Sequence, residues 1–320
     1  MMLALVAGAL ALAESGLWTW AYEAVHPPSF HWPDRRPIGS LFLARASPGW
    51  TGNPRGWFGA GDLDIASGPG RGQFRQRLQG LAEACIGNLR AANAQGIIIW
   101  DLEGEQYPHP SGSFVGDPTN LKRIAPEMDE VADDFLRRFR DAGFRVGLCI
   151  RPQSLSFRSD GSFRQHEPVL DATALYRELD RKIRYAENRW ACTLFYVDSN
   201  FGFQNLGLHW VGIFRRLHAA HPGALLIPEH GSCAYLGVSA PYTSLQAGRS
   251  WVGRFFSADG CGASRFHGFR VINVADTPAA ALPALARQVA GGDVLLFRAW
   301  VGGQDLALVQ AAYGRAGGWP

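Results

Sequence analysis

Short, continuous apolar runs recur along this 320-residue chain, and an amphipathic segment follows most of them. Their residues are apolar at successive positions rather than at alternate ones, which is typical of strands buried on both faces in a parallel sheet. We therefore predict seven strands, at residues 38–44, 96–100, 145–150, 192–197, 224–227, 269–274 and 293–297.

Helices are predicted between these strands. In the first of them Phe74, Leu78 and Leu81 recur at helical spacing, and the last ends at the Pro-Gly stop signal of residues 222–223. The clearest helical patterns cover residues 73–94, 126–142, 172–190 and 206–220.

Repeated strand–helix units indicate an α/β fold. An eighth strand, at residues 242–245 or 252–256, would complete a single (β/α)8 TIM barrel over residues 38–320. The alternative is an open, doubly wound sheet. No GxGxxG or GxxxxGK[ST] sequence follows any predicted strand, so a nucleotide-binding open sheet would lack its phosphate loop.

Residues 1–37 are predicted to form an N-terminal segment that precedes the barrel. The first 13 residues are apolar, end in Ala-Leu-Ala and resemble a secretory signal without its charged start. Three interpretations stay open: a cleaved signal, a buried N-terminal helix and a mis-assigned start. A signal would make the protein secreted or periplasmic, and otherwise we expect it to be cytoplasmic. The stretch is too short to span a bilayer, and no other stretch reaches about 18 apolar residues.

The charged residues argue against nucleic acid as a partner. The net charge is +3, and the basic residues are scattered among acidic ones without a run of five or more. Only two of the 31 basic residues are lysines, Lys122 and Lys182, and both fall in or near predicted helices. A Schiff-base mechanism therefore has few candidates.

The five cysteines contain no CxxC pair, which excludes zinc-ribbon and thioredoxin-like sites. Cys85, Cys149 and Cys192 lie in apolar runs and are expected to be small core residues. Cys233 and Cys261 lie in loop-like sequence, where a disulfide between them is an open alternative.

Polar residues, most of them acidic, follow the predicted strands. Barrel enzymes place catalytic groups at the carboxyl ends of their strands, and a carboxylate directly after a buried run is costly unless it is paired or lies in a solvated site. The candidates, from strand two to strand eight, are Asp101, Glu103, Arg151, Asp198, Glu229, His230, Asp276 and Trp300.

Two of these aspartates have simple structural alternatives. Asp276 precedes Thr-Pro and could equally be a helix N-cap, and Asp198 precedes Ser-Asn and could form an Asx turn. Glu229 is a poor capping residue, and His230 beside it favours a functional role.

Asp101 and Glu103 stand at alternate positions after the second strand. We expect them to point to the same side and to meet Arg151 from the next strand. Two roles stay open for this group: a structural salt bridge under the barrel mouth, and a clamp on sugar hydroxyl groups.

The order of these carboxyl groups resembles the α-amylase clan of barrel glycosidases. The resemblance implies that Asp198 is the nucleophile, Glu229 the acid/base and Asp276 the stabilising aspartate. Residues 143–148 and 195–198 are also similar to strands three and four of α-galactosidase-type barrels, in which the fourth-strand aspartate is again the nucleophile. That second family has its acid/base on strand six, which here would be Asp259.

Glycoside hydrolysis requires one protonated and one ionised carboxyl group. We expect Asp198 to stay ionised beside Arg151, and Glu229, which follows an apolar run, to be the acid/base with a raised pKa. The predicted function is a glycoside hydrolase or transglycosylase acting on an oligo- or polysaccharide. The predicted substrate-binding residues are Asp101, Glu103, Arg151, His230, Asp276 and Trp300.

Tryptophans add to the carbohydrate hypothesis. Trp50, Trp57, Trp100, Trp251 and Trp300 fall in or next to predicted strand-end loops, where their rings could stack on sugars. The alternative is that some of them belong to the core.

Two other functions remain as alternatives. A metal-dependent barrel hydrolase would use carboxylates and histidines such as His109 as ligands, but the first strand carries no HxH pair and HExxH is absent, so we expect no metal or other cofactor. A non-catalytic carbohydrate-binding barrel would have lost one of the two key carboxyl groups, and both Asp198 and Glu229 are present.

Overall fold

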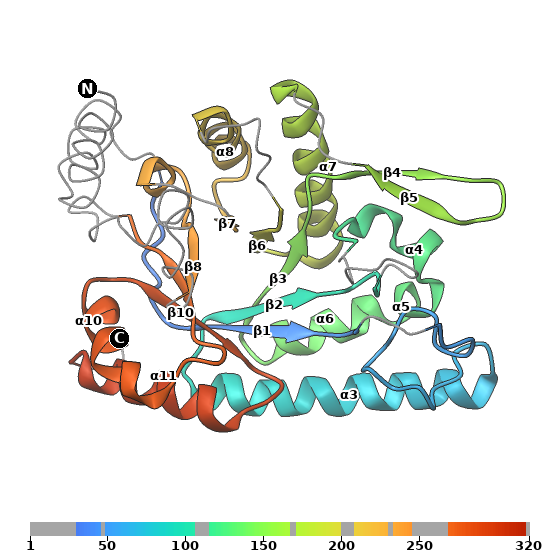
Figure 1. Cartoon of the computed structure of the whole chain (residues 1–320), viewed down its shortest axis with the longest axis horizontal. Helices are drawn as coiled ribbons and strands as arrows, with labels where there is room; N and C mark the ends of the chain where they lie inside the picture. Colours follow the sequence, from blue (N-terminus) through green and yellow to red (C-terminus); the bar gives the residue numbers. More distant parts are fainter. Residues whose placement is uncertain are drawn as a thin grey trace, which may run out of the picture.

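The structure is a computed structural model that describes residues 30–45, 49–105, 115–166, 171–199, 208–229, 233–244 and 268–317. Within these residues eight parallel strands form one sheet, as the sequence predicts (Figure 1). In chain order they are β1 (Ile38–Phe42), β2 (Gly96–Trp100), β3 (Arg145–Ile150), β6 (Leu194–Val197), β7 (Leu225–Pro228), β8 (Tyr242–Ser244), β9 (Val271–Asn273) and β10 (Val294–Arg298).

The sheet curls into a nearly closed barrel. Its strand order is β7-β6-β3-β2-β1-β10-β9-β8, so β1 and β10 pair although they stand at opposite ends of the sequence. The two end strands, β7 and β8, are joined just before β8, where the Ala240 N–H donates to the Leu226 carbonyl oxygen at 3.0 Å. This arrangement confirms the (β/α)8 barrel, and β8 confirms the first of the two positions considered for the eighth strand.

Helices cover the outside of the strands, and α3 runs alongside β1 (Figure 1). Ser67 caps α3 by accepting a hydrogen bond from the Gly70 N–H, and Asp171 caps α7 through the Ala174 N–H. The helices are α3 (Gly68–Ala91), α4 (Leu121–Ile124), α5 (Pro126–Asp129), α6 (Ala132–Asp141), α7 (Ala172–Trp190), α8 (Leu208–Ala220), α10 (Leu282–Ala290) and α11 (Gly303–Arg315).

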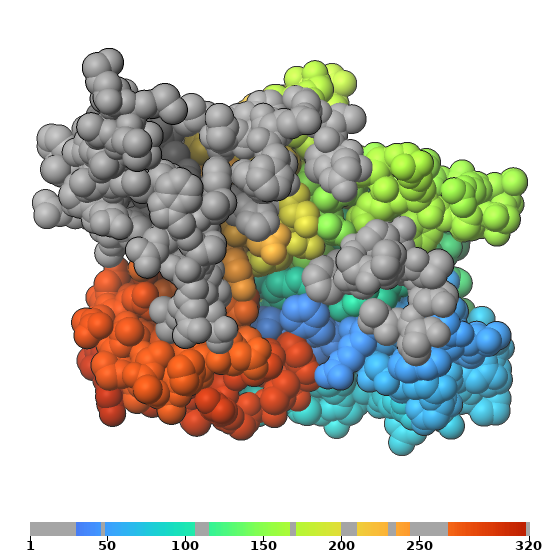
Figure 2. Space-filling view, viewed as in Figure 1, coloured from blue at the N-terminus to red at the C-terminus, as the bar shows by residue number. Residues whose placement is uncertain are grey.

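Shorter elements fill the connections. Three 3-10 turns, η1 (Pro118–Asn120), η2 (Cys233–Gly237) and η5 (Ala279–Ala281), lie in the loops after β2, β7 and β9. A hairpin of β4 (Ser154–Phe157) and β5 (Phe163–His166) follows β3 and projects beyond the barrel, in yellow-green in Figures 1 and 2.

The apolar strands divide the core into two layers. Residues such as Ile98, Leu194 and Leu296 face the barrel interior, whereas Ile97 and Phe195 face the helices. The predicted continuous runs are therefore buried on both faces, and Cys85, Cys149 and Cys192 are buried and free, as predicted.

The segment before β1 closes the bottom of the barrel. Phe30 and Trp32 belong to the interior cluster, and the Trp32 ring N–H donates to Gln95 Oε1 at 2.9 Å just before β2. Residues 1–29 lie outside the described residues, so the interpretations of the first 13 residues stay predictions. The Cys233–Cys261 disulfide also stays a prediction, because Cys261 is outside the described residues as well.

Close backbone contact between β3 and β6 depends on Gly147. A Cβ atom at this position would lie 1.9 Å from the Leu194 carbonyl oxygen, so Gly147→Ala must displace β6. We expect it to lower the free energy of unfolding by about 1–3 kcal/mol or more. Gly87→Ala, on the exposed face of α3 with nothing within 4 Å, should instead raise it by about 0.5–1 kcal/mol. Urea titrations followed by circular dichroism compare the two; equal stability of both variants would contradict this account.

Candidate active site

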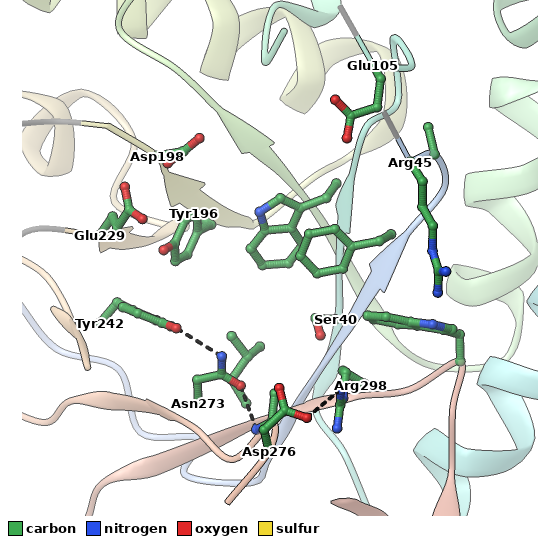
Figure 3. Close-up of a pocket in the computed structure, with 16 residues that line it drawn as sticks. Ser40, Arg45, Glu105, Tyr196, Asp198, Glu229, Tyr242, Asn273, Asp276 and Arg298 are labelled. Carbon is green, nitrogen blue, oxygen red and sulfur yellow. Dashed lines mark hydrogen bonds and ion pairs between the residues drawn. The ribbon is translucent and has the colours of Figure 1, made fainter. Parts of the chain in front are cut away.

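A pocket of about 520 Å³ opens at the carboxyl ends of the barrel strands (Figure 3). Asp198 directly follows β6 and Glu229 directly follows β7, and these strands are neighbours, so the two carboxyl groups meet at one side of the pocket. The lining residues are Ser40, Phe42, Ala44, Arg45, Trp100, Glu105, Tyr196, Asp198, Glu229, Tyr242, Asn273, Ala275, Asp276, Leu296, Arg298 and Trp300.

Ser199 links the two carboxyl groups. Its N–H donates to Glu229 Oε2 at 2.7 Å, and its hydroxyl group donates to Asp198 Oδ1 at 3.2 Å. Arg151 completes the group, with its Nε 3.3 Å from Asp198 Oδ2 and its Nη2 donating to the Ser199 hydroxyl oxygen at 2.8 Å. The end of β3 therefore brings a positive charge to the end of β6, as the sequence predicts for Arg151.

Burial raises the pKa of Asp198 to about 7, and a hydrogen bond with Glu229 together with its negative charge adds to the rise. Arg151 and Ser199 act in the opposite sense without cancelling it. The sequence predicts an ionised Asp198, but in the structure burial and the contact with Glu229 make this carboxyl group easier to protonate near neutral pH.

Lys182 of α7 holds the segment that carries Arg151. Its side chain is fully buried, and Nζ donates to the carbonyl oxygens of Arg151 and Gln153, each at 2.7 Å. Nζ also lies 3.1 Å from Glu178 Oε1. Lys182 does not line the pocket, so it contributes to the site by fixing the backbone after β3.

The segment after β2 departs from the predicted alternation. Asp101 has a φ of +60°, and the Gly104 N–H donates to its carbonyl oxygen at 2.9 Å, so the chain turns directly after the strand. Asp101 is 3% exposed, and neither of its carboxyl oxygens has a hydrogen bond of normal geometry within the described residues. Burial, with Glu105, Glu103 and Asp198 nearby, raises the pKa of Asp101 well above its usual value.

Glu103 lies within this turn and is buried. Burial and the charge of Asp117 raise its pKa to about 8, although Lys182 acts against the rise. Asp101 and Glu103 are thus brought close to each other, whereas the ion pair of Arg151 is with Asp198. Neither Asp101 nor Glu103 lines the pocket.

Asp276 and Trp300 both line the pocket on the side of β9 and β10. The Asp276 side chain is 76% exposed and its Oδ1 lies 3.1 Å from Arg298 Nη1, while the Arg298 guanidinium group also donates two hydrogen bonds to Asp305. Asp276 does not cap a helix, since η5 begins after Pro278, so the N-cap alternative is wrong. His230 and Asp259 lie outside the described residues.

Sequence reasoning missed several lining residues. Phe42, Tyr196 and Tyr242 occupy inward positions of their strands, and strand alternation could have found them once the barrel was assumed. Trp57, considered for sugar stacking, is fully buried and its ring N–H donates to Glu127 Oε1 at 2.8 Å, so that interpretation is wrong for Trp57.

Among the residues that the structure describes, no set of three or more His, Cys, Asp or Glu side chains is arranged to hold a metal ion. None of the described helices has the length and apolar character needed to cross a membrane.

The raised pKa values of Asp101, Glu103, Glu105 and Asp198 predict a pH-dependent stability. The folded protein keeps protons that the unfolded chain releases above about pH 4–5, so the free energy of unfolding should fall as the pH rises from 5 to 8. Each retained proton steepens this fall by at most about 1.4 kcal/mol per pH unit.

Glu103→Gln should make the fall shallower, and the exposed Glu83→Gln on α3 should leave it unchanged. Urea titrations at several pH values measure the slope. A stability that stays level or increases between pH 5 and pH 8 would contradict the buried, protonated carboxyl groups.

Comparisons with known proteins establish the fold. No protein-family profile and no curated protein matches this chain. The α-amylase of Geobacillus thermoleovorans complexed with acarbose matches with a TM-score of 0.50 at 8% identity, over 88% of this chain and 78% of that one. The α-L-fucosidase isoenzyme 1 of Paenibacillus thiaminolyticus has a TM-score of 0.45 at 12% identity, over 88% of this chain and 73% of that one. The α-fucosidase of Thermotoga maritima has a TM-score of 0.45 at 11% identity, over 91% of this chain and 74% of that one. The α-amylase match confirms the predicted resemblance to barrel glycosidases at the level of fold.

Proposed function

We propose that this protein is a glycoside hydrolase, or a transglycosylase, that acts on an oligo- or polysaccharide through Asp198 and Glu229. The observation that carries the proposal is the contact of these two carboxyl groups in the pocket at the barrel mouth. Such a pair provides the one protonated and one ionised carboxyl group that cleavage of a glycosidic bond needs. The solved glycosidases with a similar barrel support the proposal.

The close contact favours a covalent mechanism over direct attack by water. Enzymes that invert the anomeric carbon separate their carboxyl groups by about 6.5–9.5 Å to leave room for the water, whereas retaining enzymes separate them by about 5–5.5 Å. Asp198 and Glu229 are within hydrogen-bond reach of each other, so the shorter separation fits better. We therefore propose retention of configuration.

The contacts of each carboxyl group suggest its role. Asp198 faces Arg151 and the Ser199 hydroxyl group, which stabilise its ionised form once the shared proton moves to Glu229. Asp198 then attacks the anomeric carbon while Glu229 gives the proton to the departing oxygen. In the second step Glu229 takes a proton from water or from a hydroxyl group of an acceptor sugar. The oxygen of that water or sugar bonds to the anomeric carbon and displaces Asp198.

The walls of the pocket suit a carbohydrate. Trp100, Phe42 and Tyr196 present aromatic rings, and polar groups such as Asn273 and Arg298 lie around them. Sugar rings combine apolar faces with hydroxyl groups at their edges, and a pocket that is mostly apolar with a few polar groups matches both. Asp276, Arg298 and Trp300 are proposed to contact the substrate at the rim.

Replacing the two carboxyl groups tests their roles. Glu229→Gln should lower kcat on the natural glycan by about 10²–10⁴-fold, because it removes the general acid, and should lower it much less on an aryl glycoside with a good leaving group. Asp198→Asn should be inactive on both substrates, and the exposed Glu83→Gln should match the wild type.

The comparison has two outcomes that reject the assignment. Equal losses of Glu229→Gln on the glycan and on the aryl glycoside would reject its acid role, and normal turnover by Asp198→Asn would reject the site. The configuration of the first-formed product, measured by proton NMR, separately tests retention.

Removal of metal ions tests the alternative hydrolase. Because the described residues contain no group arranged to hold a metal, turnover should be the same before and after dialysis against EDTA. Turnover that is lost in EDTA and restored by zinc, magnesium or calcium would favour the metal-dependent mechanism.

A further inference from the structure

Glu105 is a further carboxyl group in the pocket, besides Asp198, Glu229 and Asp276, and has no role in the proposed reaction. Its backbone is fixed, because its N–H donates to the Arg55 carbonyl oxygen at 3.0 Å and the turn of residues 101–104 precedes it. Gly104 in that turn has a φ of +77°, and a Cβ there would lie 2.6 Å from the Arg55 Cβ. The position of Glu105 is therefore determined by the packing of two loops.

The Glu105 side chain is buried but unsatisfied. The residue is 8% exposed, and its Oε2 has no hydrogen-bond partner within the described residues, although it lines the pocket. Figure 3 shows its carboxyl group turned toward the pocket, on the side away from Glu229. A buried polar atom without a hydrogen-bond partner costs about 1–3 kcal/mol. A ligand group that hydrogen-bonds to Oε2 removes this cost and so binds more tightly.

Aromatic rings line the pocket that contains Glu105 and the carboxyl pair. Phe42 and Trp100 are stacked at 5.0 Å with an interplanar angle of 15°, and Tyr196 lies 4.9 Å from the Trp100 ring. All three line the pocket and are held by strand ends. Figure 3 shows Glu105 on the opposite side of the pocket from Asp198 and Glu229, so a ligand that rests on these three rings, the floor of the pocket, has one edge at the carboxyl pair and the opposite edge at Glu105.

We propose that Glu105 binds a hydroxyl group of the sugar ring that lies on Trp100 and Phe42, and thereby determines which sugar the pocket accepts. This inference rests on the proposed function and names its substrate class, an uncharged hydroxylated sugar ring. Burial raises the pKa of Glu105 to about 7, so near neutral pH its carboxyl group both donates and accepts hydrogen bonds.

The neighbours of Glu105 explain the preference for an uncharged ring. Asp101 is buried and close enough to interact with Glu105, and neither of its carboxyl oxygens has a hydrogen bond of normal geometry within the described residues. A sugar carboxylate or sulfate at this edge would have to lose its hydration in a buried place and would oppose the ionisation of Glu105, whose pKa lies near neutral pH. A neutral hydroxyl group satisfies Oε2 without adding charge.

The test is a cycle that combines a protein change with a substrate change. A set of 4-nitrophenyl glycosides identifies the sugar that is cleaved, and its monodeoxy analogues remove one hydroxyl group each. We expect Glu105→Ala to lower kcat/KM on the parent glycoside by about 10-fold, and one particular deoxy analogue to lose about 10-fold with the wild type. When Glu105→Ala is assayed on that deoxy analogue, the two losses in kcat/KM should not multiply, because the variant and the analogue remove the same hydrogen bond.

Two further variants separate binding from a structural effect. Glu105→Gln keeps the shape and both kinds of hydrogen bond, so it should retain most of the activity of the wild type. Glu83→Gln serves as the matched control on the exposed face of α3. If the losses of Glu105→Ala multiply with deoxygenation at every position, Glu105 does not bind a hydroxyl group and the inference is overturned.

A binding measurement distinguishes this inference from the proposed function. Methyl glycosides of the same sugars are titrated into wild type and Glu105→Ala by calorimetry. Binding that depends on Glu105 in a protein that cleaves no glycoside would overturn the hydrolase and support the subsite. Cleavage in which the losses of Glu105→Ala and of deoxygenation multiply would support the hydrolase and overturn the subsite. A protein that neither binds nor cleaves these glycosides would overturn both proposals.

Discussion

The hydrogen bonds of the buried Lys182 ammonium group fix the backbone after β3, and the position of Arg151 at the barrel mouth depends on them. An isolated buried charge costs several kcal/mol, and Lys182 avoids this cost by donating to the carbonyl oxygens of Arg151 and Gln153 and by pairing with Glu178. Because the Arg151 carbonyl group is held, its side chain reaches Asp198 and Ser199 from a fixed backbone. A residue on α7 that does not line the pocket thus sets the electrostatics at the end of β6.

Among the described residues at the mouth, acidic side chains outnumber basic ones, and several of these carboxyl groups have raised pKa values. Asp101, Glu103, Glu105 and Asp198 all have raised pKa values, with burial as the largest cause of each. Additional arginines would have neutralised these groups as permanent ion pairs. Carboxyl groups that keep their protons near neutral pH can instead donate hydrogen bonds or transfer protons, which suits a site that handles uncharged hydroxyl groups.

The barrel could be predicted from the sequence because burial on both faces leaves continuous apolar runs, whatever their tertiary contacts. The placement of Asp198 beside Glu229 follows from strand order alone. Glu105 could not be found in this way, because the positive φ of Asp101 ends the strand alternation and turns the chain. The sugar-stacking interpretation of Trp57 was wrong because its ring is held inside the protein by Glu127, which lies 70 residues further along the chain.

The floor of the pocket and the core of the barrel are one continuous structure. Trp100 and Tyr196 belong to the interior cluster, and Phe42 and Tyr242 pack against it while lining the pocket. Tyr196 and Tyr242 meet edge to face at 5.3 Å, and Phe42 contacts Trp300 at 5.2 Å, so the aromatic contacts extend from β8 across to β10. A sugar ring bound on this floor would add the next layer to the stacked interior of the barrel. Its position relative to Asp198 and Glu229 would therefore be set by core packing, which varies less than loops do.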